Sequence, residues 1–301
     1  MIVKSEPTPV SPCTDPSARK PSATYFVAAA LRQYDVAIAS LVSDVITGGD
    51  PEAIHQLRVQ LAKARVALLV AGLLGAKCRN LERRLRRLRR SLAPARDWSV
   101  LVAAIDAGNY QLPPTVHKRA RARLNSAVAK AKQILATPDN AKLLAELHVA
   151  ADKVEALATD QPLPALAKHA CRRAWRRLRR RARKLGGDND AQHQVRLAAK
   201  RLRYLLELFA PGWPTAEDMR VLKLLRQLQT TLGKGQDDCV QRQLLVKLGV
   251  DRHADPSGAA EPAVAQANWQ SLRQRWKLQR PLLGKGMKTE YGNGTDVSAP
   301  H

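Results

Sequence analysis

The fold is decided by HQVRLAAKRLRYLLELF, the stretch that occupies residues 193–209. Successive residues of an α-helix are rotated by about 100°, so each position in this stretch can be assigned to one side of a helix. Val195, Leu202 and Phe209 then gather on one side, while the basic residues gather on the other. The stretch is therefore predicted to form an amphipathic helix with one apolar stripe and one cationic stripe.

The cationic stripe of this helix contains His193, Arg196, Lys200, Arg203 and Tyr204. A related stripe is predicted earlier in the chain, in HQLRVQLAKAR at residues 55–65, and it contains His55, Arg58 and Arg65. Ala62 takes the place of Lys200 in this earlier stretch, which is therefore poorer in cations. The sequence predicts two related helices of unequal charge.

These stretches belong to an internal repeat. His55-Gln-Leu-Arg58 returns 138 residues later as His193-Gln-Val-Arg196. The segments that follow, LRRSLAPARDWSV at 88–100 and LQTTLGKGQDDCV at 228–240, share two leucines and an aspartate at an offset of 140. The sequence therefore predicts two similar halves, at about 23–136 and 163–283, joined by an additional helix at about 139–158.

The predicted folded region, residues 23–283, lies between two polar segments. Residues 1–22 are rich in Pro and Ser, and residues 284–301 are rich in Gly, so both are predicted to be disordered tails. Helix breakers divide the region between them at residues 48–51, 94, 112–114, 137–138, 162–164, 186–188, 211–214 and 255–256. No stretch alternates like a β-strand, and the predicted class is all-α.

Composition and charge point to a helical protein with a polyanionic partner. Hydrophobic residues make up 45% of the chain and aromatic residues only 4%, so we expect an aliphatic core. The 51 Lys and Arg exceed the 26 Asp and Glu, which gives a net charge of +25. Such an excess is normally neutralised by nucleic acid, an anionic membrane or another polyphosphorylated chain. The alternative is a basic protein that its charge merely keeps soluble.

Cysteine spacing and apolar runs indicate a cytoplasmic protein. The four cysteines form no metal-ligand or disulfide pattern, which fits a reducing cytosol. The N-terminal segment has no apolar core of a secretory signal. The longest apolar run, at residues 66–76, is shorter than the roughly 20 residues that span a bilayer, so no membrane span is expected.

Two further helices are predicted to carry arginine-rich faces. In the first, Leu81, Leu85, Leu88 and Leu92 form an apolar seam, and the reverse side carries Arg83, Arg86, Arg87 and Arg90. Its counterpart in the second half keeps Lys223 and Arg226. The other helix, at 168–185, places in line Arg172, Arg176, Arg179 and Arg183. A single charge run is usually a solvated helix face, but three with almost no compensating acid favour an anion-binding role.

Arginine donates in a planar fork to two phosphate oxygens, which favours a phosphate-rich ligand. His55 and His193 could bind metal, donate to phosphate or order their neighbours; metal is disfavoured because no carboxylates or thiolates complete a site. Asp97 and Asp237 each follow a breaker, so helix capping or pairing with arginine is preferred over catalysis. No catalytic motif, cofactor motif or acidic Mg²⁺ cluster is recognisable.

With these motifs, the chain resembles the conserved-histidine α-helical domain family, known as CHAD. The resemblance lies in the two His-x-x-Arg helices at 55–65 and 193–209 and in the paired segments SLAPARDWSV and TLGKGQDDCV. It covers nearly everything between the tails. It departs from an even repeat at Ala62 and at Gln236, which stands opposite Arg96.

The resemblance implies two four-helix bundles related by a pseudo-twofold axis, with a basic groove or pore between them that binds inorganic polyphosphate. Carried over by position, the implied phosphate contacts are His55, Arg58, Lys63, Arg65, His193, Arg196, Lys200, Arg201, Arg203 and Tyr204. The other arginine-rich faces are an extension of this set. The implied role is non-enzymatic binding, with location at polyphosphate granules in the cytoplasm.

Two alternatives remain at this point. A nucleic-acid-binding protein fits the charge, but scarce aromatic residues and the lack of a recognition-helix motif disfavour it. An enzyme acting on polyphosphate is disfavoured by the lack of a catalytic set. The sequence does not determine the oligomeric state.

Overall fold

The structure is a computed structural model that describes residues 22–159, 161–185, 189–212, 216–250 and 262–285. Within these residues the chain forms α-helices and two short 3-10 helices, η1 (Gly72–Leu74) and η2 (Ala210–Gly212), and no strand. The α-helices are α1 (Ala23–Thr47), α2 (Pro51–Ala71), α3 (Arg79–Ser91), α4 (Ala93–Asp106), α5 (Pro114–Leu135), α6 (Pro138–Glu155), α7 (Leu163–Ala182), α8 (Asn189–Phe209), α9 (Ala216–Lys247) and α10 (Pro262–Lys285). The predicted all-α class is confirmed.

The helix ends follow from the predicted breakers. Pro51 opens α2, and the Asp50 side chain accepts a hydrogen bond from the backbone N–H of Glu52 at 2.9 Å. Prolines likewise lie in the first turn of α4, α5, α6 and α7. Gly75, in the turn before α3, has a φ of 98°, a backbone conformation that favours glycine. The breakers at 186–188 and 255–256, part of the breaker at 211–214, and most of both predicted tails lie outside the described residues.

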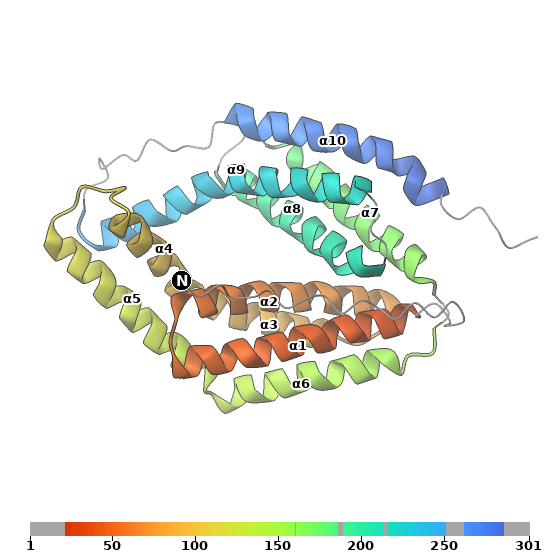
Figure 1. Cartoon of the computed structure of the whole chain (residues 1–301), viewed down its shortest axis with the longest axis horizontal. Helices are drawn as coiled ribbons and strands as arrows, with labels where there is room; N and C mark the ends of the chain where they lie inside the picture. The colour runs from red at the N-terminus through yellow and green to blue at the C-terminus, as the bar shows by residue number, and fades with distance from the viewer. Residues whose placement is uncertain (1–21, 160, 186–188, 213–215, 251–261, 286–301) are drawn as a thin grey trace, which may run out of the picture.

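The α-helices pack largely as two groups of four (Figure 1). In the first group, α1 packs against α2 and α6, and α3 also packs against α2 and α6. In the second group, α8 lies between α7 and α9, and α10 packs against α9. Trp175 of α7 and Trp269 of α10 complete this group with ring centroids 5.5 Å apart. The helix predicted at 139–158 is α6, and it forms part of the first group. The pseudo-twofold relation between the groups stays a prediction.

Leucine and alanine side chains fill the interior of both groups. Leu57 and Leu85 in the first group and Leu202 and Leu225 in the second have no exposed surface. Burying a leucine side chain contributes about 1.5–3 kcal/mol relative to leaving it in water, so the aliphatic core supplies the main stabilisation. The core therefore fixes which sides of the helices remain available for charge.

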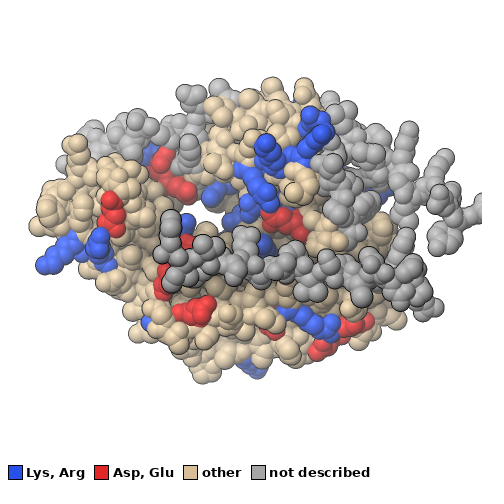
Figure 2. Space-filling view, viewed as in Figure 1, with Lys and Arg blue, Asp and Glu red and all other residues tan. Residues whose placement is uncertain are grey.

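The two groups are connected at both ends, directly at one end and through α4 and α5 at the other, and an opening lies between them. At one end Phe26 of α1 stacks on Phe209 of α8, with ring centroids 6.1 Å apart. At the other end a separate hydrophobic cluster joins α4 and α5 to the last turns of α9, and it includes Trp98, Leu101 and Leu245. Figure 2 shows an opening through the molecule, with Lys and Arg side chains gathered on its rim. The ends of the two groups are thus tied together around a cationic passage.

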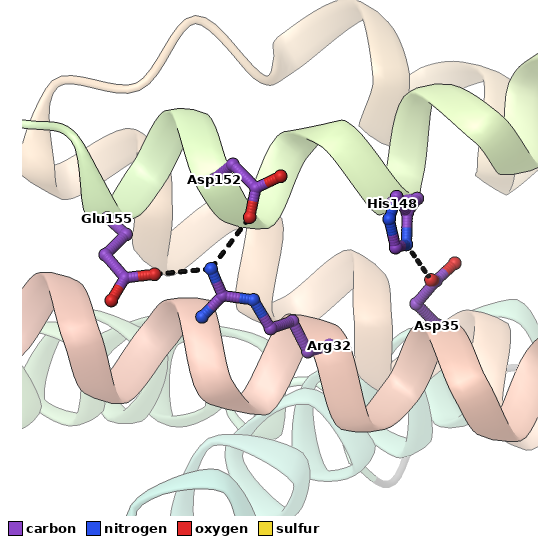
Figure 3. A network of polar contacts seen from close by, with 5 residues as sticks. All are labelled: Arg32, Asp35, His148, Asp152 and Glu155. Atoms are coloured by element: carbon purple, nitrogen blue, oxygen red, sulfur yellow. Dashed lines mark hydrogen bonds and ion pairs between the residues drawn. The ribbon is translucent and has the colours of Figure 1, made fainter.

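Of the helices that the structure describes, α1 alone has the length and apolar composition to cross a membrane. Its apolar residues do not form one uninterrupted run, because Arg32 and Asp35 lie among them. Both side chains contact α6: Arg32 donates to Asp152 at 2.7 Å and to Glu155, and Asp35 lies 2.9 Å from the His148 ring (Figure 3). Since α1 also packs against α2, its contacts are those of a bundle helix.

We expect Tyr110→Phe to lower the free energy of unfolding by about 1–3 kcal/mol. The Tyr110 hydroxyl, in the loop after α4, donates to the buried Gln241 side chain of α9 at 2.5 Å. Removing the hydroxyl leaves the Gln241 oxygen buried without that partner. Urea denaturation measures the change, and adding Gln241→Leu should restore part of it because both polar groups are then gone. If the urea midpoint of Tyr110→Phe is unchanged, this hydrogen bond does not stabilise the hydrophobic cluster around Trp98.

Candidate anion-binding site

Cations from both halves converge on one lysine of α8. Helices α2 and α8 are in contact, so their cationic stripes lie near each other. Burial lowers the pKa of Lys200 most, and four positive charges lower it further, to about 7: Arg89, Arg196, Arg203 and Arg58. Two of these belong to α2 and α3, and two to α8. We call this set, with His55 of α2, the central site.

The central site contains buried polar atoms without a partner. Burial and the charge of Arg89 lower the pKa of Arg58 to about 10. Arg58 Nη1, Arg89 Nε and His193 Nδ1 are buried and have no hydrogen-bond partner within the described part of the chain. A buried polar group without a partner costs about 1–3 kcal/mol. A ligand with several acceptor oxygens would satisfy the two arginine donors.

Tyr204 holds two of these cations in place. Its ring is buried, and Lys200 Nζ lies 5.6 Å from the ring centroid, while Arg203 Cζ lies 4.9 Å from it. Cation–π contacts of this kind contribute about 0.5–2 kcal/mol. Burial raises the pKa of the Tyr204 phenol, so the hydroxyl stays protonated at neutral pH. Tyr204 therefore acts as a neutral support for the charges beside it.

Acidic side chains lie at the margin of the central site. Arg196 is 4.0 Å from Asp237 of α9, and Arg96 is 3.9 Å from Glu52. Burial raises the pKa of Asp97 and the charge of Asp237 adds to this effect, while Arg58 opposes it. Aspartates of α4 and α9 thus act on each other at the same margin. They limit the positive charge there without reaching Lys200.

The predicted capping role of Asp97 and Asp237 is wrong, and the alternative of pairing with arginine is what the structure supports. Asp97 is inside α4 and Asp237 is inside α9. The breaker that the sequence suggests before Asp237 contains Gly233, but α9 continues through it. A glycine inside a helix costs only about 1 kcal/mol. Tertiary packing on both sides of Gly233 offsets that cost.

Helix α3 contributes Arg89, which connects the central site to its surroundings. Burial lowers the pKa of Arg89, followed by the charge of Arg65. Arg65 is itself paired, since its Nε donates to Glu82 at 3.0 Å and its Nη2 donates to the same oxygen. Arg89 is not among the predicted contacts, although it contributes the largest charge effect on both Arg58 and Lys200.

Comparison with known proteins identifies the family. The profile of the CHAD domain matches residues 28–246, which is most of the chain. The chain belongs to the CHAD domain family. A crystal structure of the CHAD domain from the plant Ricinus communis is similar, with a TM-score of 0.68 and 25% identity, over 88% of this chain and 90% of that one. PptA from Streptomyces chartreusis shares the fold, with a TM-score of 0.58 and 15% identity over 84% and 99%. A search of curated proteins gives no match.

The CHAD motifs of α2 and α8 supply most of the cations that lie together. The structure brings close His55, Arg58, Arg196, Lys200, Arg203 and Tyr204, and His193 lies half-buried on the same helix. Arg65 does not act on Lys200 among the largest effects, but its charge lowers the pKa of Arg89, which does. Arg201 lies on another side of α8, near Arg177 of α7, and Lys63 is half-buried without a described bond to the site.

The other predicted contacts of this CHAD domain face mainly outward. On α3, Arg83, Arg87 and Arg90 are exposed, although Arg90 still contributes to the field at Arg89. On α9, Lys223 is exposed, and Arg226 lies 3.5 Å from Glu207. On α7 the predicted line of Arg172, Arg176, Arg179 and Arg183 lies opposite the buried stripe. The residues of α7 that act on Arg201 are Arg177 and Arg173. Arg89, Arg173 and Arg177, which the prediction does not include, lie beside the apolar stripes of their helices.

No group of three or more His, Cys, Asp or Glu side chains that could hold a metal ion occurs in the described ranges. His55 of the first CHAD motif lies near cations instead, among them Arg96, Lys200 and Arg58. Burial lowers the pKa of His55, and Arg96 lowers it further. Neutral His55 can still donate one hydrogen bond to an anion.

We expect Lys200→Met to raise the melting temperature at pH 7 more than at pH 10. The pKa of Lys200 is lowered in the folded protein, so unfolding takes up a proton and folding stability decreases as pH falls from about 10 toward 7. Methionine removes this penalty while keeping a similar volume. Thermal denaturation at the two pH values measures it. A lower melting temperature, or a gain of equal size at both pH values, would contradict the burial of this amine among cations.

Proposed function

We propose that this CHAD domain binds inorganic polyphosphate at the central site and does not act on it as an enzyme. The observation that carries the proposal is the convergence on Lys200 of cations from both halves, which lowers its pKa to about 7. Such a cluster is an unfavourable arrangement in the free protein. An extended polyanion that lies between the halves would relieve the repulsion.

The chemistry of the donors favours phosphate. Arg58, Arg89 and Arg203 present planar guanidinium groups, which bind two phosphate oxygens at once and remain charged at neutral pH. The buried nitrogen atoms Arg58 Nη1 and Arg89 Nε can donate hydrogen bonds to such oxygens. Polyphosphate carries negative charge along its whole length, so one chain can contact cations of both halves.

The burial of Tyr204 beside the central site favours polyphosphate over nucleic acid. Base stacking needs an accessible aromatic face. Tyr204 is buried, and Lys200 and Arg203 lie beside its ring. Nucleic acid remains the second candidate because of the net charge of +25. The resemblance to CHAD proteins and their association with polyphosphate support the first candidate.

This function carries a proposal about location. A protein that binds long polyphosphate chains in the cytoplasm would gather on polyphosphate granules. A fluorescent fusion should therefore co-localise with granules in cells that make polyphosphate, and it should spread through the cytoplasm in cells that do not.

Replacing Arg58, Arg196, Lys200 and Arg203 by Glu should reduce the affinity for long polyphosphate at least about hundredfold, because attraction becomes repulsion. Calorimetry measures the affinity, and circular dichroism checks that helicity is kept. Arg119→Glu with Arg123→Glu on α5 is the control, since both residues are exposed there. Wild-type affinity should fall steeply with salt through counterion release.

Three competitors test the identity of the ligand. Orthophosphate and trimetaphosphate should compete poorly at equal phosphate concentration, because they engage few cations at once. Duplex DNA should also compete poorly; if it displaces polyphosphate equally well, the second candidate replaces the first. Release of phosphate that depends on added Mg²⁺ or Mn²⁺ would reveal an enzyme and overturn the proposed role.

The affinity should decrease as pH rises from 6 to 9, because an anion binds best when Lys200 is protonated and the pKa of this amine is about 7 in the free protein. In Lys200→Arg the charge is kept at all these pH values, so the pH dependence should flatten. Binding measured at three pH values with both proteins separates Lys200 from the titration of the ligand itself. Identical pH profiles would rule Lys200 out of the contact.

A further inference from the structure

A second set of arginines lies beyond the central site, where α7 meets α8. Burial lowers the pKa of Arg201 of α8, and Arg177 is the next largest cause, with Arg173 and Arg65 also contributing. Burial lowers the pKa of Arg177 too, and the contributing charges include Arg86 of α3. Arginines of α3, α7 and α8 therefore act on one another at this second place.

The α7 members form a row on one side of the helix. Arg173, Arg177 and Arg181 are spaced four residues apart, which places neighbouring Cα atoms about 6 Å apart along the helix axis. Arg181 donates to the side chain of Gln194 near the start of α8, which fixes one end of the row. Arg86, Arg173 and Arg177 are exposed and Arg201 is half-buried, so the row is open to solvent on its outer side.

The second set is continuous with the central site through Arg89. The charges of Arg65 and Arg86 lower the pKa of Arg89. Arg89 in turn contributes the largest charge effect on Lys200. Arg65 and Arg86 therefore act on the same arginine of α3 that acts on Lys200.

Acidic groups offset little of this charge among the largest effects on the second set. Glu82 is the carboxylate that raises the pKa of Arg201, and it is already bonded to Arg65. The largest charge effects on Arg177 come from other arginines of α7: Arg181, Arg180 and Arg173. Like charges four residues apart destabilise a helix by a few tenths of a kcal/mol per pair, so the row is an unfavourable feature for the free protein.

We propose that Arg86, Arg173, Arg177 and Arg201 form an exit track that binds the part of a long polyphosphate chain extending beyond the central site. The proposal rests on the proposed function of the central site. It assigns the track to residues beside the apolar stripe of α7, rather than to the line of Arg172 and Arg176 on the opposite side. A short chain fills the central site alone, whereas a long chain gains the additional contacts.

The test compares two chain lengths on variants that lose equal charge. Arg173→Gln with Arg177→Gln should weaken the binding of long polyphosphate about tenfold and leave tripolyphosphate binding unchanged. The slope of log affinity against log salt should decrease by about 1.4 for the long chain only, if each contact contributes about 0.7 as in single-stranded nucleic acids. Arg119→Gln with Arg123→Gln on α5 is the control for net charge. Arg172→Gln with Arg176→Gln tests the opposite side of α7.

The outcomes separate this inference from the proposed function. If wild-type protein shows no preference for polyphosphate, the proposed function fails. If it prefers long polyphosphate and Arg173→Gln with Arg177→Gln binds like the control, the exit track is overturned while the central site stands. If Arg172→Gln with Arg176→Gln alone weakens long-chain binding, the track lies on the other side of α7. Equal weakening of both chain lengths would place Arg173 and Arg177 in the central site, which also overturns the track.

Discussion

Like charges held together away from water are the constraint on which this structure depends. Lys200 and Arg58 belong to opposite halves of the chain; both lower the pKa of His55, and Arg58 also lowers the pKa of Lys200. Water would separate and screen such groups if the helices could move apart. They are held because apolar contacts close the opening at both ends, by Phe26 on Phe209 and by the cluster around Trp98. The hydrophobic core thus maintains a charge arrangement that the charges themselves oppose.

The neutral and acidic groups near the central site make this arrangement tolerable without cancelling it. Tyr204 offers its ring to two cations, so it stabilises them while adding no negative charge at neutral pH. Asp237 and Glu52 lie at the margin and pair with Arg196 and Arg96 at about the limit of an ion pair. Had these carboxylates lain beside Lys200, they would have satisfied the donors and removed the attraction for an external anion.

Helical periodicity was sufficient to predict the fold class, most helix ends and the cationic stripes of α2 and α8. It was not sufficient for α3 and α7. On these helices the side opposite the leucines carries the most arginine. The sequence analysis therefore assigns the phosphate contacts to that side, which includes Arg87 and Arg176. The side chains that meet other elements are those next to the apolar stripe, such as Arg89 and Arg177, because only the flank of a packed helix faces a neighbouring helix. Which flank has a neighbour is decided by tertiary packing.

Two other differences have the same origin. The continuity of α9 through Gly233 could not be predicted, because glycine permits a break and packing decides whether one occurs. The apolar character of α1 was hidden by Arg32 and Asp35, whose partners on α6 are distant in sequence. In each case local sequence leaves two outcomes open, and contacts between remote segments select one.

The cations around Lys200 also explain why the two halves of the repeat differ in charge. Ala62 stands in α2 where Lys200 stands in α8, and it is buried. Burial and its cationic neighbours lower the pKa of Lys200 to about 7, so it holds its proton much less firmly than an ordinary lysine. A lysine at position 62 would bring a further amine to the same cationic stripe and would add more repulsion than usable charge. Alanine there lets the helices approach, while α3 supplies arginine instead. Guanidinium keeps its proton under such conditions, which explains why the charge that one helix lacks is found on the next.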